Sequence, residues 1–149
     1  MIQDMTTLLS NKQDLSQTTG TYYSDVYNQL GDPGYTTSAD APNGVPVDLG
    51  KGVPVPLDVA VNETFTSGGA ATLTVSLQTD DNEGFSSAKT LVTSPTYALA
   101  DLVSGKRLLP EHVPYGAEQY IRIAYVIAGA TTTAGTVTAS IGSCIQSNN

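Results

Sequence analysis

The sequence predicts an all-β protein, built as a sandwich, a jelly roll or a barrel. The first observation is composition: the chain has 20 Thr, whose branched side chains suit pleated strands, and 14 Gly and 8 Pro, which mark turns. The second is hydrophobic alternation with a period of two, in short segments separated by turn residues. No segment shows the longer apolar period of an ordinary helix. At 149 residues, one domain with one core is expected.

Regular alternation begins at Val45 and predicts strands through the rest of the chain. The first long strand covers 53–61, where Pro54 and Pro56 indicate an edge position or an unpaired first half. "NETFTSGG" (62–69) is expected to turn the chain. Long strands are then predicted at 71–79, 120–128 and 136–145, with a turn at "GATTTAG" (129–135) before the last. Shorter strands are predicted in 85–94 and 96–103, and a connection over 106–119. The residues predicted to face the core are Val53, Val55, Leu57, Val59, Val61, Leu73, Val75, Leu77, Ile121, Ile123, Tyr125, Ile127, Val137, Ala139 and Ile141.

Residues 1–45 differ from the rest and are predicted to form an extended N-terminal arm and a long loop, leaving the sandwich to residues 46–149. Apolar residues are sparse in this region, and "MTTLLSNKQDLS" (5–16) leaves one short helical turn or an edge strand open. "GDPGYTTSADAPNG" (31–44) is a loop by its turn formers. The arm is expected to be able to add a strand to a neighbour's sheet edge. Four tyrosines are candidate interface residues, because Tyr combines a large contact area with a polar tip, and a place in the core is the open alternative for them. They are Tyr22, Tyr23, Tyr27 and Tyr35.

Charge argues against two classes of partner. The chain carries 14 acidic and 6 basic side chains, a net charge of −8, and only Lys106 and Arg107 adjoin. Because nucleic-acid binders neutralise phosphates with Lys and Arg, no direct nucleic-acid binding is expected, and no binding to anionic membranes. No apolar run reaches the roughly 18 residues of a membrane-spanning helix.

Cysteine use and the start of the chain bear on the compartment. Cys144 is the single cysteine, which excludes an intrachain disulfide and favours a small buried hydrophobe over a nucleophile. "MIQDMTTLLS" lacks the basic and apolar parts of a signal peptide. We therefore expect a chain made in a reducing cytoplasm, or released from one inside a particle.

The acidic stretch "TDDNEG" (79–84) is the candidate metal site. Clustered oxygen ligands suit Ca²⁺, but the offsets do not fit an EF-hand loop, whose twelfth position counted from Asp80 falls on Leu91. Asp, Asn and Gly also favour turns for backbone reasons. The stretch is therefore predicted to be a solvated hairpin corner, with no metal.

Catalytic sites are equally poorly supported. His112 is the single histidine, so a metal cluster of the cupin type cannot be assembled. A Ser-His-Asp triad would need His112 as its base, but this residue lies between Pro110 and Pro114 in a loop and no nucleophile-elbow motif is present, so a structural or surface histidine is expected. A carboxylate pair for glycoside hydrolysis stays open on sequence, although the chain has no Trp and 2 Phe to form aromatic platforms. We expect a protein that is not an enzyme and needs no cofactor.

Several segments resemble the capsid cement (decoration) proteins of short-tailed bacteriophages. They are "LLSNKQDLS", "VDLG", "LTVSLQTDDNEGFSSAKTLVTS", "YGAEQYIRIAYVIAG" and "TAGTVTASI", and the resemblance runs from Leu8 to Ile141. The most specific part is "LQTDDN" followed by "FSSAKTL". The chain departs from the family pattern in residues 20–46, which are longer than a minimal member has.

The resemblance implies a jelly-roll fold, self-association as a dimer or trimer, and attachment to the outer surface of a capsid built from a major capsid protein. The virion would then be the location, after assembly in the host cytoplasm. The alternative is a carbohydrate-binding jelly-roll module on the particle surface, because the same fold hosts many lectins.

Overall fold

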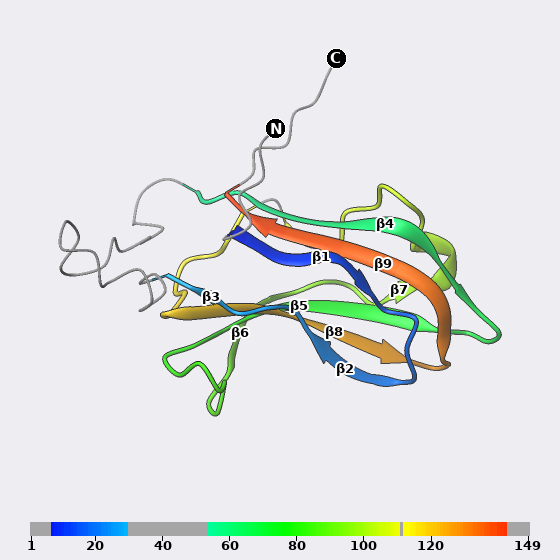
Figure 1. Ribbon diagram of the computed structural model, residues 1–149, viewed down its shortest axis with the longest axis horizontal. Helices are drawn as coiled ribbons and strands as arrows, with labels where there is room; N and C mark the ends of the chain where they lie inside the picture. Colours follow the sequence, from blue (N-terminus) through cyan, green and yellow to red (C-terminus); the bar gives the residue numbers. More distant parts are fainter. Residues whose placement is uncertain (1–6, 30–53, 111, 143–149) are drawn as a thin grey trace, which may run out of the picture.

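The structure is a sandwich of two antiparallel β-sheets (Figure 1). It is a computed structural model that describes residues 7–29, 54–110 and 112–142. The first sheet has the order β1 (Leu8–Asp14), β9 (Thr132–Ile141) and β4 (Leu57–Ser67). The second has the order β2 (Gly20–Tyr23), β8 (Tyr120–Ala128), β5 (Thr72–Asp80) and β6 (Lys89–Thr93), with β3 (Tyr27–Asn28) also on β8 and β7 (Tyr97–Ala98) also on β5. A 3₁₀ turn (η3, Leu99–Asp101) follows β7.

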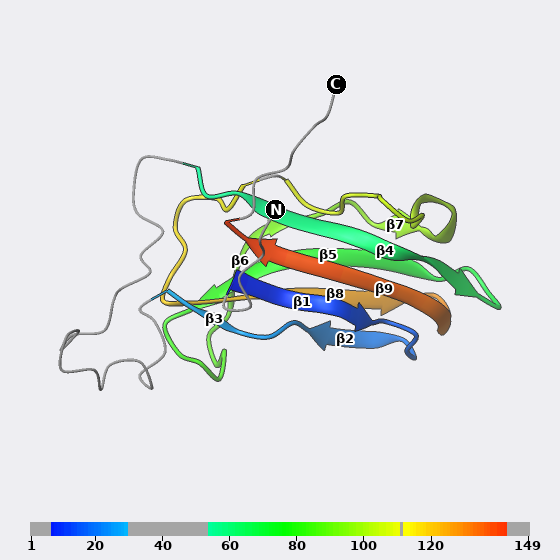
Figure 2. The same cartoon turned by 45° about the horizontal axis from the view of Figure 1, so that its top comes forward.

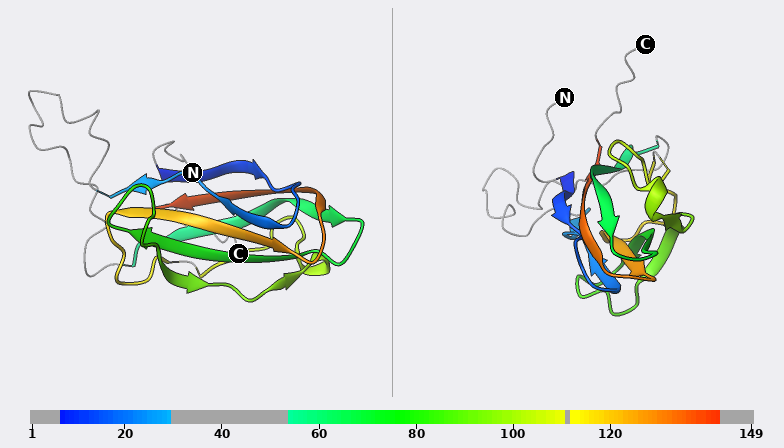
Figure 3. Two further views of the ribbon diagram at one scale, coloured as in Figure 1. Left: turned by 90° about the horizontal axis from the view of Figure 1, so that it is seen from below. Right: turned by 90° about the vertical axis from the view of Figure 1, so that its right-hand side faces the viewer.

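The connectivity confirms a jelly roll. A fourth line of chain runs beside β4, at the start of the predicted connection over 106–119. The N–H groups of Val61 and Leu108 donate to the carbonyls of Lys106 and Val59, both at 2.9 Å. The chain therefore crosses between the sheets at β1–β2, β2–β4, β4–β5, β6–Lys106, Lys106–β8 and β8–β9, which is the double Greek key of a jelly roll. Figure 3 shows the two layers end-on.

The core lies between the sheets, where the sequence pattern placed it. The predicted inward residues of β4, β5, β8 and β9 are all at most 2% exposed. Val55 packs against this core from its margin, and Val53 lies outside the described residues. A period of two produces this result because each long strand turns one face to the shared core and the other to solvent.

The prediction of an N-terminal arm is corrected for residues 8–28, although the expected boundary at residue 45 lies outside the described residues. β1 is a strand of the first sheet, while β2 and β3 belong to the second, and Leu9 and Leu15 are buried at 1% and 0% exposure (Figure 2). Register shifts against β9 and a positive φ of 47° at Lys12 interrupt the alternation of β1. Because a bulge breaks the period of two, the sequence left an edge strand and a short helical turn open for this segment, and the structure has the edge strand.

The expected turn over 62–69 is likewise corrected. β4 continues through Ser67 with register shifts on both sides of Glu63, and the chain turns at 68–71. The shifts bring Phe65 into the core, where its ring covers Gly135 of β9. Gly135 has a φ of +140°, and a Cβ there would lie 2.5 Å from the ring, so both backbone and space require glycine.

A polar chain crosses the interior and joins three strands. The Ser10 hydroxyl donates to Gln13 Oε1 at 2.7 Å, which leaves its oxygen to accept from the Tyr125 hydroxyl at 3.0 Å. Gln13 Nε2 donates to the Tyr23 carbonyl at 2.9 Å, and the Asp25 N–H donates to the Leu9 carbonyl at 2.9 Å. Burial raises the pKa of the Tyr125 phenol far above its ordinary value, with the Ser10 hydrogen bond opposing this rise, so Tyr125 stays a neutral donor.

Gly135→Ala is expected to lower the free energy of unfolding by about 2–5 kcal/mol, because the methyl group overlaps the Phe65 ring and the backbone is strained. Gly105→Ala is the matched control. Gly105 also has a positive φ, but a Cβ there meets nothing within 4 Å, so about 1–2 kcal/mol is expected. Urea denaturation of both variants measures the difference, and equal losses would contradict the packing argument.

Tyr125→Phe is expected to cost about 1–2 kcal/mol, because it removes the donor to the buried Ser10 hydroxyl without changing the ring packing. The control is Tyr115→Phe at a side chain that is 81% exposed, where a change within about 0.5 kcal/mol is expected. Thermal and urea unfolding of the two variants provide the measurement. A Tyr125→Phe variant as stable as the wild type would show that the polar chain contributes nothing net.

Candidate interaction surface

The acidic stretch forms the corner between β5 and β6, as predicted, but its first carboxylate is not solvated. Asp80 is 0% exposed and accepts hydrogen bonds from the backbone N–H groups of Asn82 (3.0 Å) and Ser87 (2.8 Å) and from the Ser87 hydroxyl (3.1 Å). Burial raises the pKa of the Asp80 carboxyl, but the hydrogen bonds from Ser87 and Asn82 outweigh it, so the pKa lies below its ordinary value. Asp80 is therefore the residue that shapes the corner.

The other polar residues of the corner are exposed to solvent: Asp81, Asn82 and Glu83. Within the described parts of the chain, no three His, Cys, Asp or Glu side chains come together in a way that could hold a metal ion. Those parts also contain no helix long and apolar enough to cross a membrane.

The four candidate tyrosines lie in different environments. Tyr27 is a core residue with 7% exposure, which corresponds to the core alternative. Tyr22 is half-buried against the core, with its hydroxyl donating to the Thr18 carbonyl at 3.0 Å. Tyr23 is 46% exposed on the outer face of the second sheet, and Tyr35 lies outside the described residues. Of the described three, Tyr23 is the one with a largely exposed side chain.

Arg122, which the sequence did not single out, stacks on that ring. It belongs to β8, between the buried Ile121 and Ile123, and so points outward. Its Cζ lies 3.7 Å from the centroid of Tyr23 and 4.0 Å from that of Phe85. One face of a guanidinium has room for a single ring at such distances, so the two rings take opposite faces. Phe85 reaches this position because its φ of 50° folds the corner back over the sheet.

The guanidinium is also fixed in its own plane. Arg122 Nε donates to Gln78 Oε1 at 2.9 Å on the neighbouring strand β5. We call the four residues Tyr23, Gln78, Phe85 and Arg122 the arginine cluster. Farther along the same face the strands carry hydroxyl pairs, Thr74 with Thr96 at 3.0 Å and Ser76 with Thr93 at 3.1 Å. The outer face thus carries hydroxyl pairs beside β5, with the ordered Arg122 guanidinium near one end.

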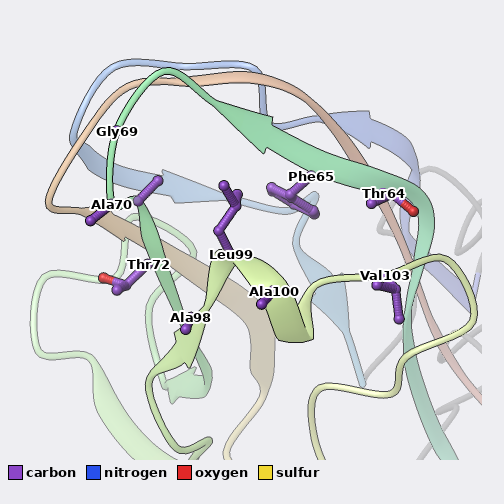
Figure 4. A pocket seen from close by; sticks show the side chains of 10 residues that line it. Thr64, Phe65, Gly69, Ala70, Thr72, Ala98, Leu99, Ala100 and Val103 are labelled. Atoms are coloured by element: carbon purple, nitrogen blue, oxygen red, sulfur yellow. The ribbon is translucent and has the colours of Figure 1, made fainter.

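An apolar groove lies at the opposite end of the sandwich, beyond the end of β4. Its volume is about 590 Å³, and Figure 4 shows Leu99 of η3 between Phe65 and Ala70. Val103, at 48% exposure, extends the apolar surface. The lining side chains with a polar atom are Thr64 and Thr72, and no titratable group is among them. The groove can bury apolar surface but offers no acid, base or nucleophile.

The two remaining sequence candidates fall in separate places. His112 is exposed and forms a backbone bridge with Pro56 at the margin of the first sheet. Cys144 lies outside the described residues. His112 is therefore not part of the arginine cluster or of the lining of the groove.

Asp80→Asn is expected to destabilise the protein at neutral pH, because an amide has one acceptor oxygen for three donors and turns its NH₂ toward one of them. The Asp80 pKa is lowered in the folded state, so its contribution is present above the unfolded pKa of about 4 and is lost as pH falls through the folded value. The gap in Tm between wild type and variant should therefore close between about pH 5 and pH 2. A gap that does not change with pH would contradict the ionised hydrogen-bonded carboxylate.

Comparison with known proteins gives one family. No curated protein matches the chain significantly. A family model described as Bbp16 matches residues 36–141, more than two thirds of the chain and most of the sandwich from before β4 to the end of β9. The chain therefore belongs to the Bbp16 family.

Proposed function

We propose that this chain is a structural protein of a bacteriophage virion, not an enzyme, that decorates the outer surface of the capsid and cements it by bridging major capsid protein subunits. One observation carries the proposal. The resemblance to decoration proteins runs from Leu8 to Ile141, and these are the first residue of β1 and the last residue of β9. The resemblance therefore draws on strands of both sheets, with a departure in residues 20–46, and is not confined to a shared local motif.

Membership of the Bbp16 family supports the phage assignment, since the name of that family suggests phage-related proteins. The jelly roll agrees with a structural role, although this fold alone carries no function. Bridging also fits the placement of the two surface features. The arginine cluster lies near the start of β8 and the apolar groove near its end, so the sandwich offers separate contacts at its two ends (Figures 1 and 4).

The physics of a shell suits such a protein. Packed DNA presses outward on the head, and a protein that contacts two neighbouring coat subunits resists their separation. Many copies, each binding modestly, add avidity without requiring a tight single contact. A net charge of −8 keeps free subunits soluble and makes direct binding to the packaged DNA unfavourable. Self-association as a dimer or trimer would multiply the contacts of each copy.

Density-gradient sedimentation of native particles, with quantitative mass spectrometry of each fraction, tests the proposal. The chain is expected to migrate with a coat protein at a fixed stoichiometry and to remain bound in about 0.2 M salt, because buried contacts are screened less than exposed charges. Particles made without the chain are expected to lose DNA at a lower temperature than complete ones.

A chain that stays at the top of the gradient would contradict the proposal. Binding to a glycan array by the same preparation would then support the carbohydrate-binding alternative. If particles made without the chain lose their DNA at the same temperature as complete particles, the cementing part of the proposal alone is contradicted.

A further inference from the structure

We infer that the arginine cluster is the energetic centre of the coat-protein contact, and that Arg122 receives a single carboxylate of the partner protein through its free edge. This inference rests on the proposed function and adds to it the residue and the chemistry of the contact. The cluster consists of Arg122 between the rings of Tyr23 and Phe85, with Gln78 holding Nε.

The two Nη atoms of Arg122 are the part of the guanidinium that remains available to a partner. Both faces of the guanidinium are covered by rings, and Nε is engaged by Gln78. The N–H groups on the two Nη atoms lie in the guanidinium plane, at the edge that the rings leave open. A carboxylate approaching this edge can accept two parallel hydrogen bonds, which is the geometry that arginine favours. The side chain is already ordered, so binding costs little conformational entropy.

Arg122 has no carboxylate partner among the described residues. Arg107, the other described arginine, pairs with Asp58 through Nε at 3.2 Å. Lys89 pairs with Glu118. Among residues 7–29, 54–110 and 112–142, no carboxylate lies within 4.0 Å of Arg122. A half-buried guanidinium that is fixed by three neighbours and has no anion of its own is ready to accept one from outside.

The charges around the arginine cluster indicate which kind of partner fits it. Exposed acids adjoin the cluster in sequence, Asp25 beside β2 and Asp81 and Glu83 in the corner that carries Phe85. A polyanion such as nucleic acid would be repelled by them, whereas one carboxylate flanked by basic side chains complements both the cation and its acidic border. Arg and Tyr are also the residue types in which interface hot spots are enriched.

A protein carboxylate fits this site better than a sugar acid. A sugar-binding site needs an open aromatic face on which the ring can stack. Here Phe85 is 8% exposed, and the rings of Tyr23 and Phe85 each have one face occupied by the guanidinium. The hydroxyl pairs farther along the sheet can add further hydrogen bonds to a protein partner.

The test measures binding of the purified chain to coat shells assembled without it. Arg122→Met is expected to weaken binding by ~30-fold or more, and Arg122→Lys by ~10-fold, because lysine keeps the charge but loses the planar fork. Arg107→Met changes the net charge by the same amount at a residue that already has a carboxylate, and is expected to stay within ~3-fold of wild type. Melting curves ensure that every variant is folded at the assay temperature.

A second variant keeps the test decisive if Arg122→Met unfolds the corner. Tyr23→Leu alters an exposed side chain, so the protein should fold, and it should weaken binding by ~5-fold or more through loss of stacking. Equal binding by wild type, Arg122→Lys and Tyr23→Leu would overturn the inference while leaving the cement role intact. Displacement of the chain from shells by millimolar glucuronate, but not by acetate at the same concentration, would overturn the protein partner in favour of a sugar acid. Failure of the wild type to bind shells would instead contradict the proposed function itself.

Discussion

The shared core between two sheets is the constraint on which every other feature depends. β8 lies between β2 and β5 and sends Ile121, Ile123, Tyr125 and Ile127 inward, each at most 2% exposed. Burying an aliphatic side chain of this size contributes about 1.5–3 kcal/mol. Because side chains alternate along a strand, fixing these residues inside also fixes Arg122 outside. The outer surface of the second sheet is therefore set by the same register that builds the interior.

The sequence predicted the fold well wherever this alternation was uninterrupted. The inward residues of β5, β8 and β9 were identified from the period of two alone, and they are buried. Prediction failed where a bulge or a short strand breaks the period. The β1 segment was assigned to an arm, with an edge strand left open, because the register shifts around Lys12 hide its pairing with β9. The second half of β4 was taken for a turn for the same reason. The strand beside β4 at Lys106 is too short and too irregular to show any period.

The arginine cluster was less accessible to prediction because its members come from three distant parts of the chain. Tyr23 was proposed as an interface residue on its chemistry, but nothing in the sequence pairs residue 23 with residues 85 and 122. Their meeting depends on the β2–β8–β5 order and on the left-handed conformation of Phe85. The acidic corner shows the same limit at shorter range. Its turn formers identified the corner, while the inward rotation of Asp80 depends on donors at Asn82 and Ser87 that only the folded loop presents.

The contact between β1 and the segment after β2 has a consequence for crowding. The Asp25 N–H donates to the Leu9 carbonyl, and Gln13 bonds the Tyr23 carbonyl, so on this side the border of the first sheet is tied to the second. An open strand border is a template on which identical molecules polymerise edge to edge. Tying this border shut removes one such template. Neighbouring copies can then make contact along this side of the sandwich without pairing their strands into a continuous sheet.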